Sequence, residues 1–283
     1  MPYKPRYINA GGHLIDLDIP KVMGILNITT DSFYKGSRYN SDEEILGAAG
    51  RMLQDGADII DIGGYSSRPG APDISVDEEG SRVFRAISLI SAEFPDAVIS
   101  VDTFRASIAE EAVVRCGARI INDISGGDAD PGMFRLIEKL NVPYILMHMK
   151  GDPRTMQDNP VYKDVVADIL TWFGERIFRL RSAGVKDIII DPGFGFGKTI
   201  DHNFDLLNRL GDLSIAGLPL LVGVSRKSMI WKTLNVTAEE ALTGTISLNT
   251  VALLKGADIL RVHDVKEAVQ AVRLVCKLRN ESA

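Results

Sequence analysis

Eight short apolar runs recur along the chain, and the spacing between them leaves room for a helix in each interval. The runs cover residues 22–28, 58–64, 97–102, 119–126, 142–149, 187–193, 219–225 and 258–264. Most are continuously apolar, which is typical of strands covered on both faces in a parallel sheet. Four of the intervening stretches end in a glycine, the residue that favours the left-handed cap of a helix: Gly56, Gly117, Gly184 and Gly256.

Eight strand–helix units in 283 residues predict a (β/α)8 TIM barrel of the α/β class. Residues 6–19 read as two short strands around a Gly-Gly turn, so we expect a β-hairpin over the bottom of the barrel. We therefore predict one domain over residues 1–283, with the barrel at about 20–280. The alternative, an open doubly wound sheet, needs no eighth strand and usually carries a GxGxxG loop, which does not follow the first run.

Two capping boxes predict where helices begin. Ser41 with Glu44, and Thr237 with Glu240, have the spacing at which side chain and backbone cap each other reciprocally.

Charge and cysteine usage narrow the class of partner. The net charge is −6 without a basic block, which argues against nucleic acid as the main partner. The first residues form no apolar leader, and no run approaches the roughly 18 residues of a membrane span, so we expect a cytoplasmic protein that does not bind membranes. Cys116 and Cys276 show no metal spacing and read as thiols in a reducing compartment.

Polar residues stand at the carboxyl end of every predicted strand, where barrel active sites lie. Four of them suit a flat, amide-rich heterocycle, because carboxylates and amides can bond its ring edge: Asp102, Asn122, Asp191 and Lys227. Four others suit a phosphate: Asn27, Arg68, Arg261 and His263.

Other polar residues admit a structural role as readily as a functional one. Asp61 and Asp123 are equally compatible with tying neighbouring loops or helix ends, and His148 with a hydrogen-bonded core histidine. We expect His13 and His202 to be surface or capping residues.

The stretch DPGFGFGKT, residues 191–199, approaches a nucleotide-binding P-loop but is one residue short of it. Pro192 stands where the first glycine of such a loop belongs. We therefore read Lys198 as a loop charge and not as a phosphate ligand.

The motifs at the strand ends resemble those of the dihydropteroate synthase family, in the same order, from about residue 20 to 275. They read MGILNITTDSF, DIGGYSSRPGA, ISVDTF, IINDISG, ILMHM, DPGFGFGKT, VGVSRKS and LRVHDV. The resemblance implies a transferase of folate biosynthesis that joins 6-hydroxymethyl-7,8-dihydropterin diphosphate to p-aminobenzoate and releases pyrophosphate. It also implies a homodimer, and it leaves open how well sulfonamides, which mimic p-aminobenzoate, inhibit this chain.

The resemblance also implies roles for individual residues. Catalytic roles fall on Asp102, Asp191, Lys227 and Arg261. The pterin would be held by Asp102, Asn122, Asp191 and Lys227, and the diphosphate by Asn27, Arg68, Arg261 and His263. The p-aminobenzoate would meet Phe196 and Ser228, and Met147 and Gly223 would also bind substrate. A Mg²⁺ cofactor would be held at Asn27. The chain departs from the family at Thr30, Lys35 and Tyr65, and Lys35 cannot replace the usual acidic residue.

The mechanism expected from these residues is dissociative: the C–O bond breaks before the arylamine attacks, because the pterin ring can spread positive charge. One alternative is a pterin-dependent methyltransferase domain, which shares the pterin contacts but has no need of Arg68, Arg261 or His263. Others are a Schiff-base aldolase using Lys227 and a non-catalytic pterin-binding homologue.

Overall fold

Eight parallel strands form a barrel, as the sequence predicts. The computed structural model describes residues 7–28, 41–66, 72–151, 156 and 160–280. The barrel strands are β3 (Lys21–Asn27), β4 (Ile59–Gly63), β5 (Val98–Asp102), β6 (Ile120–Asp123), β7 (Tyr144–Met147), β8 (Ile188–Asp191), β9 (Leu221–Val222) and β10 (Ile259–Val262). They pair in the order β8-β7-β6-β5-β4-β3-β10-β9. A single bridge between Ile190 and Leu220 joins β8 to β9 and closes the ring.

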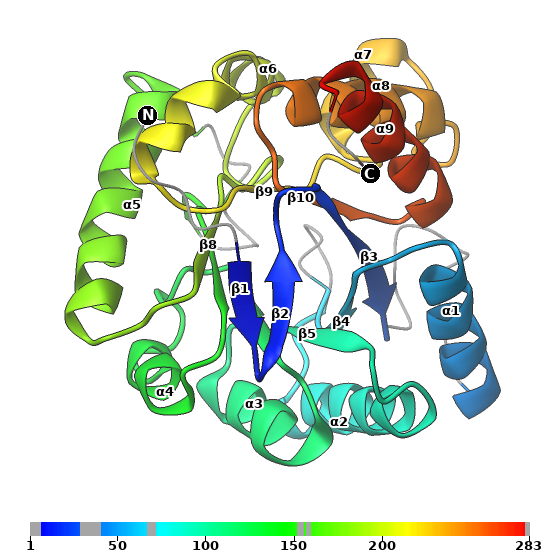
Figure 1. Cartoon of the computed structure of the whole chain (residues 1–283). Coiled ribbons are helices and arrows are strands. Elements are labelled where there is room, and N and C mark those ends of the chain that lie inside the picture. Colours follow the sequence, from blue (N-terminus) through cyan, green and yellow to red (C-terminus); the bar gives the residue numbers. More distant parts are fainter. Residues whose placement is uncertain (1–6, 29–40, 67–71, 152–155, 157–159, 281–283) are drawn as a thin grey trace.

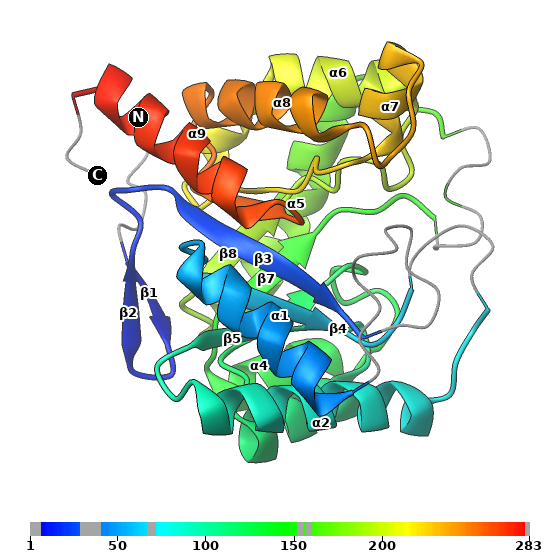
Figure 2. The same cartoon turned by 90° about the vertical axis from the view of Figure 1, so that its right-hand side faces the viewer.

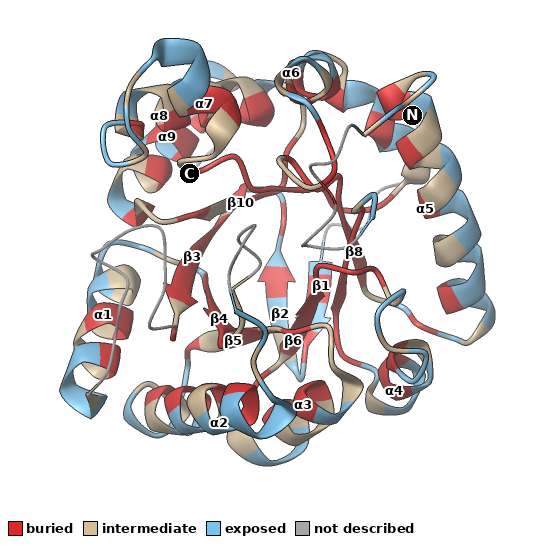
Figure 3. Cartoon of the chain, turned by 180° about the vertical axis from the view of Figure 1, so that it is seen from behind, coloured by how far each residue is buried: buried red, intermediate tan, exposed pale blue. Residues whose placement is uncertain are grey.

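Helices surround the strands and cover their outer face (Figures 1 and 2). They are α1 (Asp42–Gln54), α2 (Val76–Glu93), α3 (Ala106–Glu111), α4 (Met133–Leu140), α5 (Val165–Ser182), α6 (Ile200–Asn208), α7 (Ser228–Leu234), α8 (Leu242–Leu254) and α9 (Val265–Leu278). A π-helical turn, η2 (Ala112–Cys116), extends α3, and a 3₁₀-helix, η3 (Leu210–Ala216), follows α6. Figure 3 shows the inner helix faces buried and the outer faces exposed.

Successive residues of each strand face opposite sides of the barrel wall. On β4, Ile60 and Ile62 belong to the large core between strands and helices, whereas Ile59 belongs to a smaller cluster inside the barrel. This is the period of two that a pleated strand imposes. The near-continuous apolar runs of the sequence therefore serve two separate cores, one inside the barrel wall and one outside it.

The predicted N-terminal hairpin is confirmed and fills the bottom of the barrel. β1 (Tyr7–Ala10) and β2 (His13–Asp16) pair antiparallel around a turn at Gly11 and Gly12. Both glycines have positive φ, at 61° and 94°, which a side chain would disfavour. Ile8, Ala10, Ile15 and Leu17 join the cluster inside the barrel. The hairpin therefore covers the apolar interior at the end opposite the polar strand ends.

The helix ends follow most of the local signals. Ser41 and Glu44 form the predicted capping box of α1. Thr237 and Glu240 also bond reciprocally, but α8 begins only at Leu242, so these bonds stabilise a turn before the helix and not its first residues. All four glycines expected to end helices have positive φ, between 85° and 102°.

Asn249 on α8 offers a test of how the outer core is packed. Its side chain is fully buried, and neither amide atom has a hydrogen-bond partner among the described residues. An unsatisfied buried amide costs about 1–3 kcal/mol. We therefore expect Asn249→Ala to raise the free energy of unfolding by about 1–2 kcal/mol, since alanine also favours the helix. Urea denaturation measures this.

Thr245, one turn earlier on the same helix, is the matched control. Its hydroxyl is also buried but accepts a hydrogen bond from the backbone N–H of Arg226 at 3.0 Å. Thr245→Ala should lower the free energy of unfolding. A loss of stability in Asn249→Ala would contradict the prediction and indicate an ordered partner for the amide.

Candidate active site

The polar strand ends meet at one level of the barrel mouth. In the register of the sheet, Asn27 on β3 lies opposite Gly63 on β4, and Gly63 lies opposite Asp102 on β5. Asp102 in turn lies opposite Asn122 on β6. Neighbouring strands therefore present these residues side by side, although up to 95 positions separate them in sequence.

A charged cluster occupies the centre of this level. Arg261 on β10 donates from Nε to Asp61 Oδ2 and from Nη2 to Asp102 Oδ2, each at 2.6 Å. Asn122 Nδ2 donates to the same oxygen of Asp61 at 2.9 Å. Sequence reasoning left Asp61 open between a loop tie and a functional role. In the described part of the chain it orients an arginine and an amide of the site and ties no loop.

The alternation of inward and outward residues on β4 could have revealed Asp61. Ile59 faces the barrel interior, and a period of two carries Asp61 to the same side. Burial raises the pKa of the neighbouring Asp102 carboxyl to about 7, against the opposing effect of Arg261. The cluster therefore holds a carboxylate that can change its protonation near neutral pH.

A second charged group lies at the ends of β8 and β9. Asp191 Oδ1 accepts the backbone N–H of Gly193 at 2.7 Å. Lys227, the N-cap residue of α7, donates to the carbonyl of Phe194 and lies 4.7 Å from the ring centroid of Phe196. Burial lowers the pKa of the Lys227 amine to about 8, although Asp191 acts against this shift. Burial also raises the pKa of Asp191, against the opposing effect of Lys227.

The glycine-rich loop after β8 needs its glycines because the backbone passes close to β7. Gly193 has φ 68°, and a Cβ there would lie 1.9 Å from the carbonyl oxygen of His148. Gly195 and Gly197 also have positive φ. No residue with a side chain fits at Gly193 without moving the backbone.

Lys198 is not the loop charge that the sequence suggested. It is only 3% exposed. Its Nζ lies 2.9 Å from the carbonyl oxygen of Gly193, 3.0 Å from that of Phe196 and 3.0 Å from His148 Nδ1. The lysine thus holds the glycine-rich loop from within. A lysine after glycines in a loop is usually exposed, and no local signal in the sequence reveals the burial of Lys198.

His148 is a hydrogen-bonded core histidine, which is the structural one of the two roles that the sequence left open. Burial lowers its pKa to about 2, so the ring is neutral and its Nδ1 can accept from Lys198. Asp123 also has a structural role. Its carboxylate accepts from the Ser125 backbone and hydroxyl, from Gly127 N–H and from Tyr144 Oη. His202 completes the capping box of α6 with Thr199.

His263, directly after β10, is oriented by Ser225. His263 Nδ1 lies 3.0 Å from Ser225 Oγ, which also accepts the His263 backbone N–H at 3.2 Å. Burial, followed by the charge of Arg261, lowers the pKa of His263 to about 4. The ring is therefore neutral at neutral pH. One of its two ring nitrogens therefore carries a proton and can donate.

The other predicted residues lie around these groups. Met147 ends β7 opposite Asp191, and Ser228 is the first residue of α7. A Cβ on Gly223 would lie 3.8 Å from Arg261 Cβ and 3.9 Å from Lys227 Nζ. Arg68, Thr30 and Lys35 lie outside the described residues.

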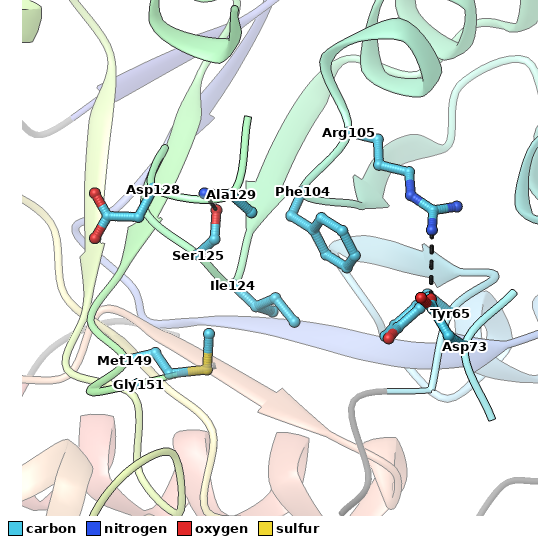
Figure 4. A pocket seen from close by; sticks show the side chains of 10 residues that line it. All are labelled: Tyr65, Asp73, Phe104, Arg105, Ile124, Ser125, Asp128, Ala129, Met149 and Gly151. Atoms are coloured by element: carbon cyan, nitrogen blue, oxygen red, sulfur yellow. Dashed lines mark hydrogen bonds and ion pairs between the residues drawn. The ribbon is translucent and has the colours of Figure 1, made fainter. Parts of the chain in front are cut away.

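A cavity of about 330 Å³ opens beside the polar cluster, over the ends of β4 to β7 (Figure 4). Its lining is Tyr65, Asp73, Phe104, Arg105, Ile124, Ser125, Asp128, Ala129, Met149 and Gly151. Tyr65, which departs from the family motif, packs edge-on against Phe104 at 5.0 Å. Of the residues expected to bind substrate, none that the structure describes lines this cavity, so it flanks the site and does not replace it.

Comparison with known proteins identifies the class. Residues 23–263 match the family of pterin binding enzymes. The chain is 46% identical to the dihydropteroate synthase of Escherichia coli over 94% of both chains. It is 42% identical to that of Haemophilus influenzae over 90% of this chain and 93% of the other.

Solved structures agree. A Yersinia pestis dihydropteroate synthase in a sulfonamide drug complex superposes with a TM-score of 0.92 at 43% identity, covering 97% of this chain and 99% of the other. The Xanthomonas albilineans enzyme with 4-aminobenzoic acid gives 0.89 at 38% identity, covering 98% and 99%. The chain belongs to the pterin-binding enzyme family. Within it, the chain belongs with the dihydropteroate synthases, transferases of folate synthesis, and the resemblance seen in the sequence is confirmed.

Asp102 leads to a pH prediction for pterin binding. Its carboxylate can accept two ring N–H bonds, whereas the protonated acid loses acceptor capacity. Because the pKa of Asp102 is raised to about 7, the affinity for a pterin should fall as the pH is lowered from about 7 towards about 5, by up to tenfold per pH unit. Calorimetric titration of a pterin across this range measures it.

Asp102→Asn is the control, since it cannot titrate. It should bind the pterin more weakly, and its pH dependence should be smaller by one proton. An unchanged slope in this variant would assign the titration to another group, such as Asp191, whose pKa is also raised.

Proposed function

We propose that this chain condenses 6-hydroxymethyl-7,8-dihydropterin diphosphate with p-aminobenzoate to give 7,8-dihydropteroate and pyrophosphate. One observation carries the proposal. Asp102 and Asn122 meet Arg261 in a single charged cluster at the barrel mouth, in a chain that matches dihydropteroate synthases over nearly its whole length.

Asp102, Asn122 and Asp191 hold the pterin in this proposal. Asn122 donates its Nδ2 to Asp61, so its oxygen is the atom directed to a ring donor. Asp191 is held by Gly193 N–H, and Lys227 lies near it as a donor. Met147 and Gly223 contribute the shape of the pocket, Gly223 because it leaves room between Arg261 and Lys227.

Arg261 and His263 bind the diphosphate, together with Arg68 from the second loop. Arg261 is already paired with two carboxylates, so it links the pterin end of the site to the diphosphate end. His263 is neutral, because its pKa is lowered to about 4, and in this proposal a ring N–H donates to the diphosphate. The site thus combines cationic and neutral donors for an anion.

Asn27 fits a Mg²⁺ that also binds substrate phosphates. Its Oδ1 and Asp102 Oδ2 both border the space where a Cβ on Gly63 would lie, at 3.4 and 3.6 Å. Mg²⁺ commonly takes one or two protein oxygens, with phosphates and water completing its shell. When bound, the ion would supply charge neutralisation for the departing pyrophosphate.

Phe196 and Ser228 receive p-aminobenzoate. Phe196 lies over the Lys227 amine, so its ring borders the pterin pocket and can pack on an aromatic acid. Ser228 follows Lys227 directly and begins α7, and in this proposal its hydroxyl and backbone N–H donate to the carboxylate of p-aminobenzoate.

Bond breaking precedes bond making in the proposed reaction. The C–O bond breaks and its electron pair leaves with pyrophosphate, which Arg261 and His263 hold. Positive charge then spreads over the pterin ring, where the carboxylates of Asp102 and Asp191 stabilise it. The arylamine nitrogen attacks the CH₂ carbon and releases one proton to solvent. Positioning by the chain supplies much of the rate, and a strong general base is not required.

The whole chain acts as one domain in this proposal, since the hairpin and the barrel share an interior core. We place it in the cytoplasm, where thiols stay reduced, because Cys116 and Cys276 are both free. None of the helices in the described ranges is long and apolar enough to cross a membrane.

Pyrophosphate release tests the function. Release from the pterin diphosphate should require both p-aminobenzoate and Mg²⁺, and Asp102→Asn should lower kcat/KM by about 100-fold or more, because the charge that stabilises the cation is lost. Arg209→Gln is the control, since Arg209 pairs with Asp164 at 2.9 Å, outside the polar cluster. Pterin binding without release in the wild type would contradict the function and favour a non-catalytic homologue.

The homodimer implied by the family fits exposed leucines on α8 and α9. Leu254, Leu274 and Leu278 are 49%, 73% and 70% exposed, and Arg279 bonds the Leu253 carbonyl, which brings the two helix ends together. Buried apolar area stabilises an interface. Sedimentation equilibrium should give twice the 30.9 kDa chain mass, and Leu274→Glu with Leu278→Glu should give monomers.

Phe178→Glu on α5 is the matched control. Phe178 is 73% exposed but lies on a helix that the proposed interface does not include. A monomeric wild type, or dissociation by Phe178→Glu alone, would contradict this interface.

A further inference from the structure

Side chains continue the pairing of β9 and β10 where the backbone ladder stops. The two strands pair only through Leu221 with Ile259 and Val222 with Leu260. Three residues further along each segment, Ser225 and His263 are joined by two hydrogen bonds, at 3.0 and 3.2 Å. The segments that carry the site residues are therefore aligned by side chains and not by the sheet.

The next pair along is stronger. Arg226 donates from Nε to Asp264 Oδ2 at 2.9 Å and from Nη2 to Asp264 Oδ1 at 2.8 Å. This is the two-pronged geometry in which an arginine fork fits a carboxylate best. The side chains are only 7% and 13% exposed, so water competes little with the pair.

Arg226 also has an unusual backbone. Its φ is 55°, in the left-handed region that is unfavourable for a residue with a side chain. Such a conformation persists only where its surroundings hold it, and it clusters at functional sites. Here its backbone N–H donates to Thr245 Oγ1 at 3.0 Å, and Nη1 donates to the carbonyls of Ala238 at 2.9 Å and Glu239 at 2.7 Å.

The Arg226–Asp264 ion pair lies next to proposed site residues in both segments. Arg226 immediately precedes Lys227 and Ser228, and Asp264 immediately follows His263. The left-handed turn at Arg226 sets the direction in which the chain enters α7. One ion pair thus joins the segment that serves p-aminobenzoate to the segment that serves the diphosphate.

We infer that Arg226 and Asp264 are positioning residues that align the p-aminobenzoate end of the site with its diphosphate end. This inference rests on the proposed synthase function. Neither side chain touches the reacting atoms. They act through Lys227 and Ser228 on one side and through His263 on the other, and a displacement of about 1 Å between reacting groups can cost on the order of 100-fold in rate.

Steady-state kinetics of four variants test the inference: Arg226→Gln, Arg226→Gly, Asp264→Asn, and the double variant Arg226→Gln with Asp264→Asn. Each single variant should lower kcat/KM for p-aminobenzoate by about 30-fold, and the double variant should lose no more, because partners that act as a unit are not additive. Arg209→Gln, which breaks an ion pair outside the site, should keep wild-type kinetics.

The Arg226→Gly variant distinguishes the effect of the ion pair with Asp264 from the effect of the left-handed turn at Arg226. Glycine adopts a positive φ without strain, so Arg226→Gly preserves the backbone and removes the ion pair together with the Nη1 bonds to the Ala238 and Glu239 carbonyls. Asp264→Asn weakens the ion pair and keeps those two bonds. Wild-type kcat/KM in Arg226→Gly would overturn the inference, since the arginine would then serve the turn alone. Losses that multiply in the double variant would also overturn it.

Ring-nitrogen NMR gives a readout that does not depend on turnover. The chain has four histidines, so the His263 and His148 signals can be assigned by substitution. In Arg226→Gln and Arg226→Gly, the His263 signals should shift while those of His148 stay unchanged. An inactive wild type would contradict the proposed function alone. Unshifted His263 signals in both variants would overturn the positioning role.

Discussion

Closure of eight parallel strands into a barrel forces every second residue of each strand into a shared interior. The lower part of this interior is apolar, with Met23, Ile59 and Ile120 packed against the hairpin. The same alternation carries Asp61, Asp102 and Arg261 inward near the carboxyl ends. The barrel therefore stacks a stabilising apolar layer beneath a polar layer that cannot stabilise by burial alone.

Burying the polar layer costs desolvation free energy, which the attraction between its opposite charges offsets. Arg261 lies between two carboxylates at 2.6 Å, and one oxygen of Asp61 has no hydrogen-bond partner among the described residues. Removing charges from water costs several kcal/mol each, so such clusters add little net stability. Such a cluster serves instead to orient its side chains. The cluster fixes the relative positions of Arg261 and of the carboxylate that we propose accepts from the pterin.

The loops beyond the strands are held by a small number of buried side chains. Lys198 donates to the carbonyls of the glycine-rich loop. Asn203, on α6, accepts a hydrogen bond from the Gly195 N–H of the same loop. Arg226 and Asp264 do the same for the segments after β9 and β10. Because β9 pairs over only two residues, side-chain contacts have to provide alignment that longer strands would provide through the backbone.

Apolar runs and glycine caps in the sequence were enough to predict the eight strands, the barrel and the hairpin, because period and helix termination are local properties. The order of polar residues at the strand ends also sufficed to gather Asp102, Asn122, Asp191, Lys227 and Arg261 at one mouth. The pairing of Asp61 and the burial of Lys198 were beyond that reasoning. Asp61 pairs with Arg261, which is 200 residues away, and Lys198 is buried against two carbonyls of its own loop and His148 Nδ1. Local sequence determined which residues face the mouth. Tertiary structure decided which of them pair, because hydrogen bonds and ion pairs depend on distances that only the closed barrel fixes.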